Sequence, residues 1–147
     1  MARGGEVALD FQDTFRARGY ELLITPRVVT ELRWLELYGN SAERKEAGLA
    51  FTNLRQWSVK PVDLSSLAQA IAWRFADALM RKRLIPEGEL GDARVLGETA
   101  VAGVPVLVTF DKHLLGVDDD ELCLAADEAD LPRVSIVHPG RLLRAIR

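Results

Sequence analysis

The spacing of apolar residues divides the start of the chain into short periodic segments. Val7, Phe11 and Phe15 recur every four residues with polar residues between them, which is typical of an amphipathic helix ending at Arg18-Gly19. Val7, Leu9 and Phe11 also alternate as the residues of a strand would, so the first segment has two interpretations.

Strands and helices then alternate along the rest of the chain. Continuous apolar runs such as VPVLVT (104–109) are typical of strands that helices cover on both faces. The alternation predicts a three-layer α/β/α domain with a mainly parallel central sheet. The predicted strands are 20–25, 58–62, 104–109 and 133–138, and the predicted helices are 25–39, 41–57, 65–83, 92–102 and a last one that begins at Pro139.

Local signals predict where several helices begin, where one ends and which face one buries. Thr25 and Ser41 are expected to cap the helices that follow them, and Gly39 is expected to end the first of these two helices. The helix at 65–83 carries an apolar stripe at helical spacing, which we expect in the core. The stripe consists of Leu67, Ile71, Phe75 and Leu79.

Size and composition indicate an ordinary globular protein. The 147 residues fit one domain spanning 1–147, and the net charge of −3 gives no support to a broadly basic nucleic-acid binder. Cys123 is the single cysteine, which excludes an internal disulfide and favours a cytoplasmic location. No apolar run reaches the roughly 20 residues of a membrane span, so we expect no membrane association.

Three carboxylates stand at junctions between strands and helices. Glu31 follows LLIT on or beside an apolar stripe, Asp92 opens the helix DARVLGETAVA, and Asp111 follows the strand VPVLVT. Each has a plain structural interpretation: Glu31 paired with Arg27 or Arg33, and the two aspartates as helix N-caps. In a parallel sheet, however, these junctions converge on one edge, so the three acids are expected to share a pocket.

Clustered carboxylates favour binding of a hard divalent cation. Like charges in a poorly solvated pocket repel one another unless a proton or a cation compensates. Carboxylate oxygens without histidine or cysteine ligands suit Mg²⁺ or Mn²⁺. Such a cation lowers the pKa of bound water and neutralises charge on a phosphodiester, which predicts metal-assisted phosphoryl chemistry.

The chain resembles the PIN-domain family of metal-dependent ribonucleases, which includes the VapC toxins of bacterial toxin–antitoxin pairs. The resemblance is carried by LLITPRVVTEL, by GELGDARVLGETAVAGVPVLVTFDKHLL and by RVSIVHPGRLLRAI, and it covers most of residues 20–147. It implies that Glu31, Asp92 and Asp111 are catalytic, metal-binding acids supported by Thr109. It also implies cleavage of RNA with Mg²⁺ or Mn²⁺, an antitoxin protein as partner, and a homodimer.

Two departures from the family pattern bear on the activity. The family begins with a central strand that ends in an aspartate, whereas this chain opens MARGGEVALDFQDTF, which looks more like the helix after that strand. Either VALD is the strand and Asp10 the acid, or the strand is missing, which would leave a gap in the sheet for its neighbours to close or another chain to fill. His113 also stands where some relatives have a further aspartate. The alternative function is therefore a catalytically impaired PIN-like module that binds RNA or a protein partner.

Overall fold

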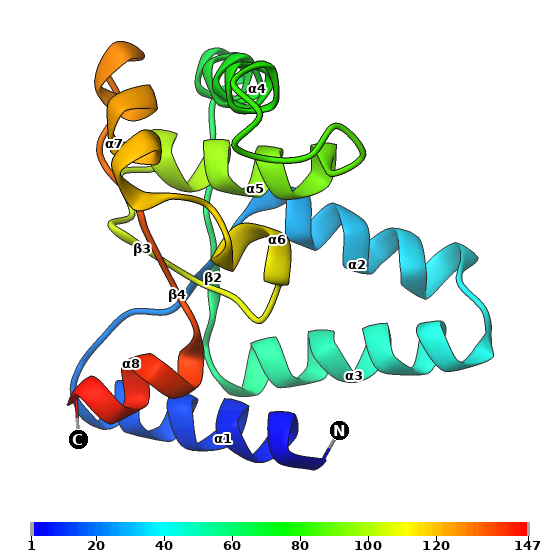
Figure 1. Cartoon of the computed structure of the whole chain (residues 1–147). Helices are drawn as coiled ribbons and strands as arrows, with labels where there is room; N and C mark the ends of the chain where they lie inside the picture. Colours follow the sequence, from blue (N-terminus) through cyan, green and yellow to red (C-terminus); the bar gives the residue numbers. More distant parts are fainter. Residues whose placement is uncertain (1, 147) are drawn as a thin grey trace.

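The computed structural model describes the backbone of residues 2–146 and the side chains of residues 9–146. The protein is an α/β protein that is mostly helical, with 64% of its residues in helices and 7% in strands (Figure 1). The helices of the described residues are α1 (Ala2–Ala17), α2 (Pro26–Tyr38), α3 (Ser41–Gln56), α4 (Ser66–Arg81), α5 (Leu90–Val101), α6 (Lys112–Leu115), α7 (Asp119–Glu128) and α8 (Pro139–Ile146). The strands are β1 (Leu23–Ile24), β2 (Lys60–Pro61), β3 (Val106–Val108) and β4 (Ser135–Val137).

The strands form two separate parallel pairs instead of one central sheet. In the described residues β1 pairs with β2 and β3 pairs with β4, with Leu23 opposite Lys60 and Leu107 opposite Ile136. The parallel direction and all four strand positions are confirmed. The prediction of a single sheet in a three-layer fold is not borne out by the described residues, because no strand there connects β1 to β3. Each strand therefore has one neighbour and pairs over only two or three residues.

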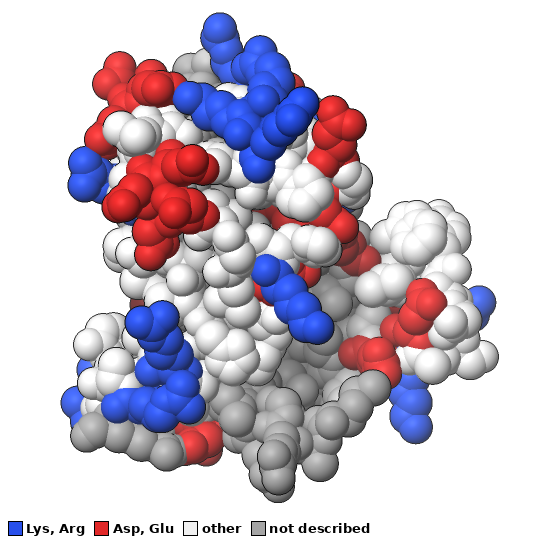
Figure 2. Space-filling view, in the orientation of Figure 1, with Lys and Arg blue, Asp and Glu red and all other residues white. Residues whose placement is uncertain are grey.

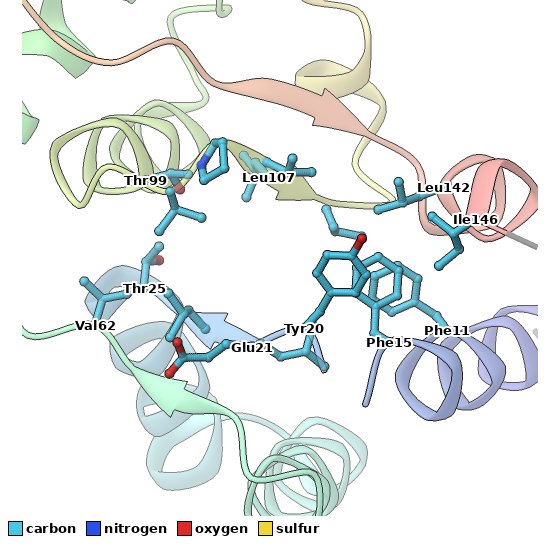
Figure 3. Close-up of a pocket in the computed structure, with 16 residues that line it drawn as sticks. Phe11, Phe15, Tyr20, Glu21, Thr25, Val62, Thr99, Leu107, Leu142 and Ile146 are labelled. Atoms are coloured by element: carbon cyan, nitrogen blue, oxygen red, sulfur yellow. The ribbon is translucent and has the colours of Figure 1, made fainter. Parts of the chain in front are cut away.

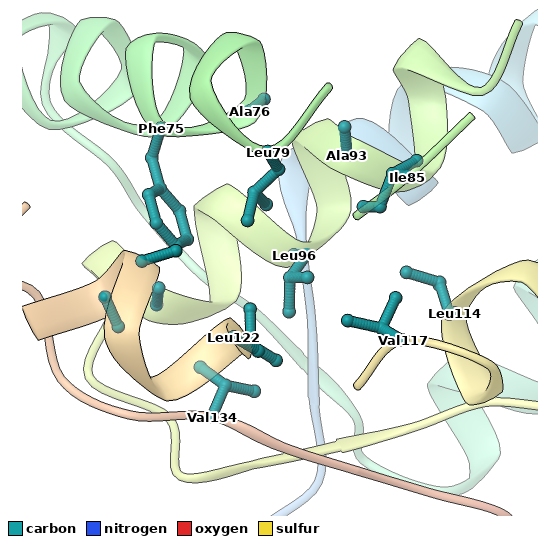
Figure 4. Packing of buried hydrophobic residues seen from close by; sticks show 13 residues of the cluster. Phe75, Ala76, Leu79, Ile85, Ala93, Leu96, Leu114, Val117, Leu122 and Val134 are labelled. Carbon is teal, nitrogen blue, oxygen red and sulfur yellow. The ribbon is translucent and has the colours of Figure 1, made fainter. Parts of the chain in front are cut away.

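The main hydrophobic core lies where α5 crosses α4 and the segments around α6 and α7 (Figure 4). Leu79, Ile85 and Leu96 are fully buried there. The buried residues of α4 are Ala72, Phe75, Ala76 and Leu79. The prediction for Leu67 and Ile71 is wrong: their side chains are 73% and 41% exposed, because α5 covers α4 on a face turned away from them.

Two residues of α4 and α5 set how closely these helices approach. Gly97 of α5 lies against the backbone of α4, and a Cβ added there would overlap the carbonyl oxygen of Ala72. The glycine therefore permits a close helix crossing. This crossing fixes the position of α5, which carries Asp92 in its first turn.

A smaller apolar cluster joins the two ends of the chain. Phe11 and Phe15 of α1 stack with ring centroids 4.2 Å apart and pack with Leu143 of α8. The helical interpretation of the first segment is thus confirmed, and α1 extends further towards the N-terminus than predicted. Asp10 lies within this helix, so the interpretation of VALD as a strand ending in Asp10 is wrong.

Two predicted helix caps differ from those observed. Asn40 caps α3 in place of Ser41, and its side chain accepts a hydrogen bond from the Glu43 N–H at 2.9 Å. Thr25 holds the N-cap position of α2 but makes no capping hydrogen bond with its side chain. Gly39 ends α2 as predicted. Among the described helices, none combines the length and apolar character needed to cross a membrane.

Candidate acidic site

The predicted acids come from three different elements that meet beside the start of α5. Glu31 lies on α2, Asp92 in the first turn of α5, and Asp111 at the N-cap of α6, three residues after the end of β3. Figure 2 shows acidic side chains gathered in a recess over the part of the molecule where α2, α5 and α6 meet in Figure 1. The convergence of the three junctions does not require the single sheet that the sequence predicted.

Asp92 experiences the strongest electrostatic effect in this group. Its pKa is raised to about 6, first because the carboxyl is partly buried and then because of the charges of Asp111 and Glu89, a hydrogen bond with the Glu89 carboxyl, and the charge of Glu31. Its Oδ2 atom is buried and has no hydrogen-bond partner among the described residues. An orphaned buried carboxylate oxygen among other acids is the local feature that a cation would satisfy.

The structural interpretation of Asp92 as a helix cap is wrong. The N-cap position of α5 is taken by Glu89, whose side chain makes no capping hydrogen bond, and Asp92 lies three residues further along. Asp92 is therefore not required to hold the backbone at the start of α5. Glu89 is an acid of the site that the sequence analysis missed, and its place three residues before Asp92 was the available signal.

Asp111 serves as a cap and also lies near Asp92. Its Oδ1 atom accepts hydrogen bonds from the N–H groups of His113 and Leu114 at 2.8 and 3.1 Å, which caps α6. The Thr109 hydroxyl accepts a hydrogen bond from the Asp111 N–H at 3.0 Å. Thr109 thus orients the backbone that carries Asp111, which is a supporting position for the site. The interpretation of Asp111 as a helix cap is confirmed, and the capping bonds use only Oδ1.

Glu31 is held by an arginine of its own helix. Its Oε1 atom lies 2.9 Å from the Arg27 Nε, as one of the structural interpretations predicted. A Cβ added at Gly91 would lie 2.7 Å from this Oε1 atom, so the missing side chain of Gly91 allows Glu31 to lie against the residue next to Asp92. The ion pair is half-exposed, with side-chain exposures of 31% and 47% for Arg27 and Glu31.

Glu98 is a second buried carboxylate that the sequence analysis did not select. Its side chain is 1% exposed, and both its oxygens accept hydrogen bonds from the backbone N–H of Arg27, at 3.0 and 3.1 Å. It thereby satisfies an N–H of the first turn of α2 that Thr25 leaves without a cap. Burial raises the pKa of Glu98, while the Arg27 N–H and the charges of Arg27 and Arg94 oppose that rise. The acid within the apolar run LGETAVAG was the signal in the sequence.

The carboxylate oxygens are of a chemical type that suits a hard divalent cation, but the arrangement of these side chains does not form a metal site. Carboxylate oxygens are the ligands that Mg²⁺ and Mn²⁺ prefer, and Oδ2 of Asp92 lacks a partner. Within the part of the chain that the structure describes, however, no three His, Cys, Asp or Glu side chains are arranged to hold a metal ion. Binding through all three predicted acids would require Glu31 to leave Arg27 and turn towards Asp92.

The hollow next to the start of α5 opens on a different face of that helix from the acids. It has a volume of about 680 Å³, and its charged lining residues are Arg74, Asp77, Arg81 and Glu87. It reaches Leu90, which lies about 200° around α5 from Asp92. On the side of the acids, His113 Nε2 lies 3.6 Å from Glu89 Oε1.

Comparison with known proteins found no relative: no protein-family model, no curated protein and no solved structure matches this chain.

Proposed function

We propose that the protein is a PIN-like, divalent-metal-dependent endoribonuclease whose site is formed by Glu31, Asp92 and Asp111. The observation that carries the proposal is the buried, unpartnered Oδ2 of Asp92, in a carboxyl whose pKa is raised by its burial and by three neighbouring acids. A structural carboxylate is normally neutralised by a salt bridge or by backbone N–H groups. Asp92 instead has acids around it, an arrangement that costs stability and is typical of functional sites.

Each acid has a defined part in this proposal. Asp92 and Asp111 would hold Mg²⁺ or Mn²⁺, with Glu31 joining them when it leaves Arg27. The cation, when bound, would lower the pKa of a water molecule and offset charge on the RNA phosphodiester. Thr109 keeps Asp111 in place by accepting its N–H, so that the Oδ2 atom of Asp111 can turn towards Asp92 while Oδ1 caps α6.

The basic residues beside the site support a phosphate ligand. Arg27 lies beside Glu31, and Lys112 is exposed directly after Asp111. Arginine and lysine side chains placed like this can follow a phosphate backbone that passes the acids. RNA is therefore the substrate that we propose.

Exposed apolar residues support a protein partner. Trp34, Leu37 and Tyr38 on α2 have exposed fractions of 57%, 56% and 68%. Large apolar side chains gathered on one helix commonly mark a protein-binding surface. We propose accordingly that the protein is the toxin of a toxin–antitoxin pair, with either an antitoxin protein or a second copy of the chain on this face.

A specific observation favours a second candidate, a PIN-like module that binds RNA or a protein without cutting. The described carboxylates do not form a ready three-residue metal site, and Arg27 neutralises Glu31. Within the described residues, no central strand lies between the two strand pairs to supply a further acid. This candidate predicts RNA or partner binding that divalent cations do not change.

An RNA-cleavage assay with increasing Mn²⁺ or Mg²⁺ separates the two candidates. We expect metal-dependent cleavage by the wild-type protein and a loss of about tenfold or more in Asp92→Asn and in Asp111→Asn, since each variant removes a proposed metal ligand. Absence of cleavage by the wild-type protein at every metal concentration would reject the nuclease in favour of the binding module.

Asp118→Asn is the matched control for Asp111→Asn. Both residues are N-caps whose side-chain oxygen accepts from a backbone N–H, at 3.0 Å from the Glu121 N–H in the case of Asp118. Asparagine is as good a cap as aspartate, so both variants keep their helix starts. Only the variant at Asp111 should lose activity.

A further inference from the structure

An apolar cavity separates the two strand pairs. It has a volume of about 420 Å³ and lies between β1 and β3 (Figure 3). Phe11, Phe15 and Leu142 line it from α1 and α8, and Val62 and Thr99 line it at the opposite end. The backbone segments 20–23 and 104–108 form its two long sides, so a strand edge borders it on each side.

The edge of β1 that faces away from β2 has unused hydrogen-bonding capacity. Lys60 and Val62 donate their N–H groups to the carbonyl oxygens of Leu22 and Ile24, at 3.1 and 2.9 Å. Successive residues of a strand direct their N–H and C=O groups to opposite sides. The backbone groups of Leu23 therefore point away from β2, towards the cavity that Leu23 lines.

The same alternation applies to β3. The Pro105 carbonyl accepts from β4 at 2.9 Å, and the Thr109 N–H donates to β4 at 3.0 Å. The backbone groups of Val106 and Val108, which have the opposite parity, point away from β4 and towards the cavity. Two strand edges with free donors and acceptors thus face each other, and an unpaired edge is a template for another strand.

A buried polar group inside the cavity lacks a partner. Thr25 is only 9% exposed and lines the cavity, yet its Oγ1 atom has no hydrogen-bond partner among the described residues. Figure 3 shows Thr25 at the end of β1, on the cavity side. A purely apolar occupant would leave this hydroxyl unsatisfied, whereas a peptide backbone offers it both donors and acceptors.

We propose that this cavity binds an extended apolar segment of a second polypeptide chain, which inserts as a strand between β1 and β3 and bonds to both. Binding by strand addition takes its affinity from main-chain hydrogen bonds and its selectivity from side-chain pockets. Among the residues whose side chains the structure describes, Glu21 is the one charged residue that lines the cavity, so the inserted segment is uncharged along its length. The proposal is independent of any nuclease activity.

The two strands that border the cavity run in opposite directions (Figure 3). Leu22, at the start of β1, packs in the same cluster as Val108, at the end of β3. The N–H of Arg27, just after β1, bonds to Glu98, which precedes β3. The inserted segment is therefore parallel to one of the two strands and antiparallel to the other.

The test uses the synthetic peptide acetyl-Gly-Leu-Val-Ile-Val-Lys-Lys-amide and hydrogen exchange of the intact protein followed by NMR. We expect the amides of Leu23, Val106 and Val108 to gain protection of about tenfold or more on peptide addition, since they acquire acceptors. The same peptide with N-methylated apolar residues keeps its side chains but loses its donors, and it should bind at least about tenfold more weakly.

Val106→Pro supplies the complementary variant. It removes one N–H that points to the cavity and none that β4 uses, so the pairing of β3 with β4 should persist. Peptide binding should weaken while the Leu107 amide stays protected. Weaker peptide binding together with a protected Leu107 amide would show that the variant folds and has lost only the N–H donor at the edge of β3.

Three outcomes would overturn the proposal. Equal binding of the N-methylated peptide would mean an apolar ligand site without strand pairing. Protection of the three amides in the monomeric, peptide-free protein would mean that a segment of the same chain fills the gap. Unchanged exchange at millimolar peptide would mean that the edges do not accept a strand.

Discussion

The carboxylate of Asp111 lies close enough to Asp92 to contribute to the rise of the Asp92 pKa to about 6, although β3 and α5 place the two residues 19 positions apart in the sequence. Burial of Asp92 is the larger cause, and Glu89 and Glu31 add to it. The acids are therefore one electrostatic unit, and a change at any of them should be detectable at Asp92.

The first prediction concerns the titration of Asp92. Its side-chain carboxyl resonance should titrate near pH 6, and Asp111→Asn should lower the pKa because it removes a neighbouring negative charge. Carbon-detected NMR over the acidic range measures this. Asp118→Asn, at the start of α7, should leave the Asp92 pKa unchanged. An Asp92 carboxyl that titrates near 3.8 would show that the acids do not interact.

The raised pKa also makes stability depend on pH. The folded pKa of about 6 lies above the ordinary aspartate value of 3.8, so folded Asp92 binds a proton more tightly than the unfolded chain does. This contribution to the free energy of unfolding is fully present below pH 3.8 and is lost as pH rises through about 6. Asp92→Asn should therefore stabilise the protein by about 1 kcal/mol above pH 6, after allowance for solvent screening. Urea denaturation at several pH values measures it, and a destabilised variant at neutral pH would contradict it.

A second prediction separates the hydrogen bonds of Glu98 from its charge. Glu98→Gln keeps an acceptor for the Arg27 N–H and removes a poorly solvated charge, so the free energy of unfolding should change by less than about 1 kcal/mol. Glu98→Ala leaves that buried N–H without a partner and should cost about 2 kcal/mol. Urea denaturation measures both variants, with Glu46→Ala on the exposed face of α3 as control. Equal losses in the Gln and Ala variants would show that the charge itself is what stabilises α2.

Features of the fold that depend on local interactions could be predicted from the sequence, whereas features that depend on long-range contacts could not. Most helix positions were recovered because their signals are local, as at Gly39, where α2 ends, but α7 was not among the predicted helices. The single sheet was not recovered, because pairing β1 with β3 needs a strand between them that the described residues do not contain. Leu67 and Ile71 fit a helical stripe, but which side of the stripe α5 would cover is a tertiary property.

The candidate site could also be predicted only in part. The convergence of Glu31, Asp92 and Asp111 follows from strand–helix junctions that a pattern of residues can locate. Glu98 was missed because a glutamate in an apolar run gives no indication that its oxygens will bond to the N–H of Arg27, 71 residues earlier.

A third prediction tests the close crossing of α4 and α5. Gly97→Ala would place a Cβ onto the Ala72 carbonyl, so the helices must separate and the protein should lose about 2 kcal/mol or more of stability. Gly48→Ala is the matched control, since it lies within α3 and its Cβ would meet no atom within 4 Å. This control should stabilise the protein by about 0.5–1 kcal/mol through helix propensity. Thermal unfolding of both variants measures the difference, and equal behaviour would contradict the crossing.

A fourth prediction concerns the ion pair that restrains Glu31. Arg27→Gln frees the Glu31 carboxylate and removes a cation that competes for it, so Mn²⁺ should bind several-fold more tightly. Arg33→Gln is the control on the same helix, because Arg33 pairs with Glu36 at 3.1 Å. Isothermal titration calorimetry measures both. An unchanged or weaker Mn²⁺ affinity in Arg27→Gln alone would exclude Glu31 as a ligand.

The proposed metal site is tested most directly by a titration with paramagnetic Mn²⁺ followed by NMR line broadening in the wild-type protein. We predict that resonances of Asp92 and Asp111 broaden first and those of Glu31 with them, and that Asp92→Asn abolishes this effect. The acidic start of α7, at Asp118–Glu121, is an internal competitor of similar charge. Broadening that begins there, and leaves Asp92 sharp, would contradict a metal site at the start of α5.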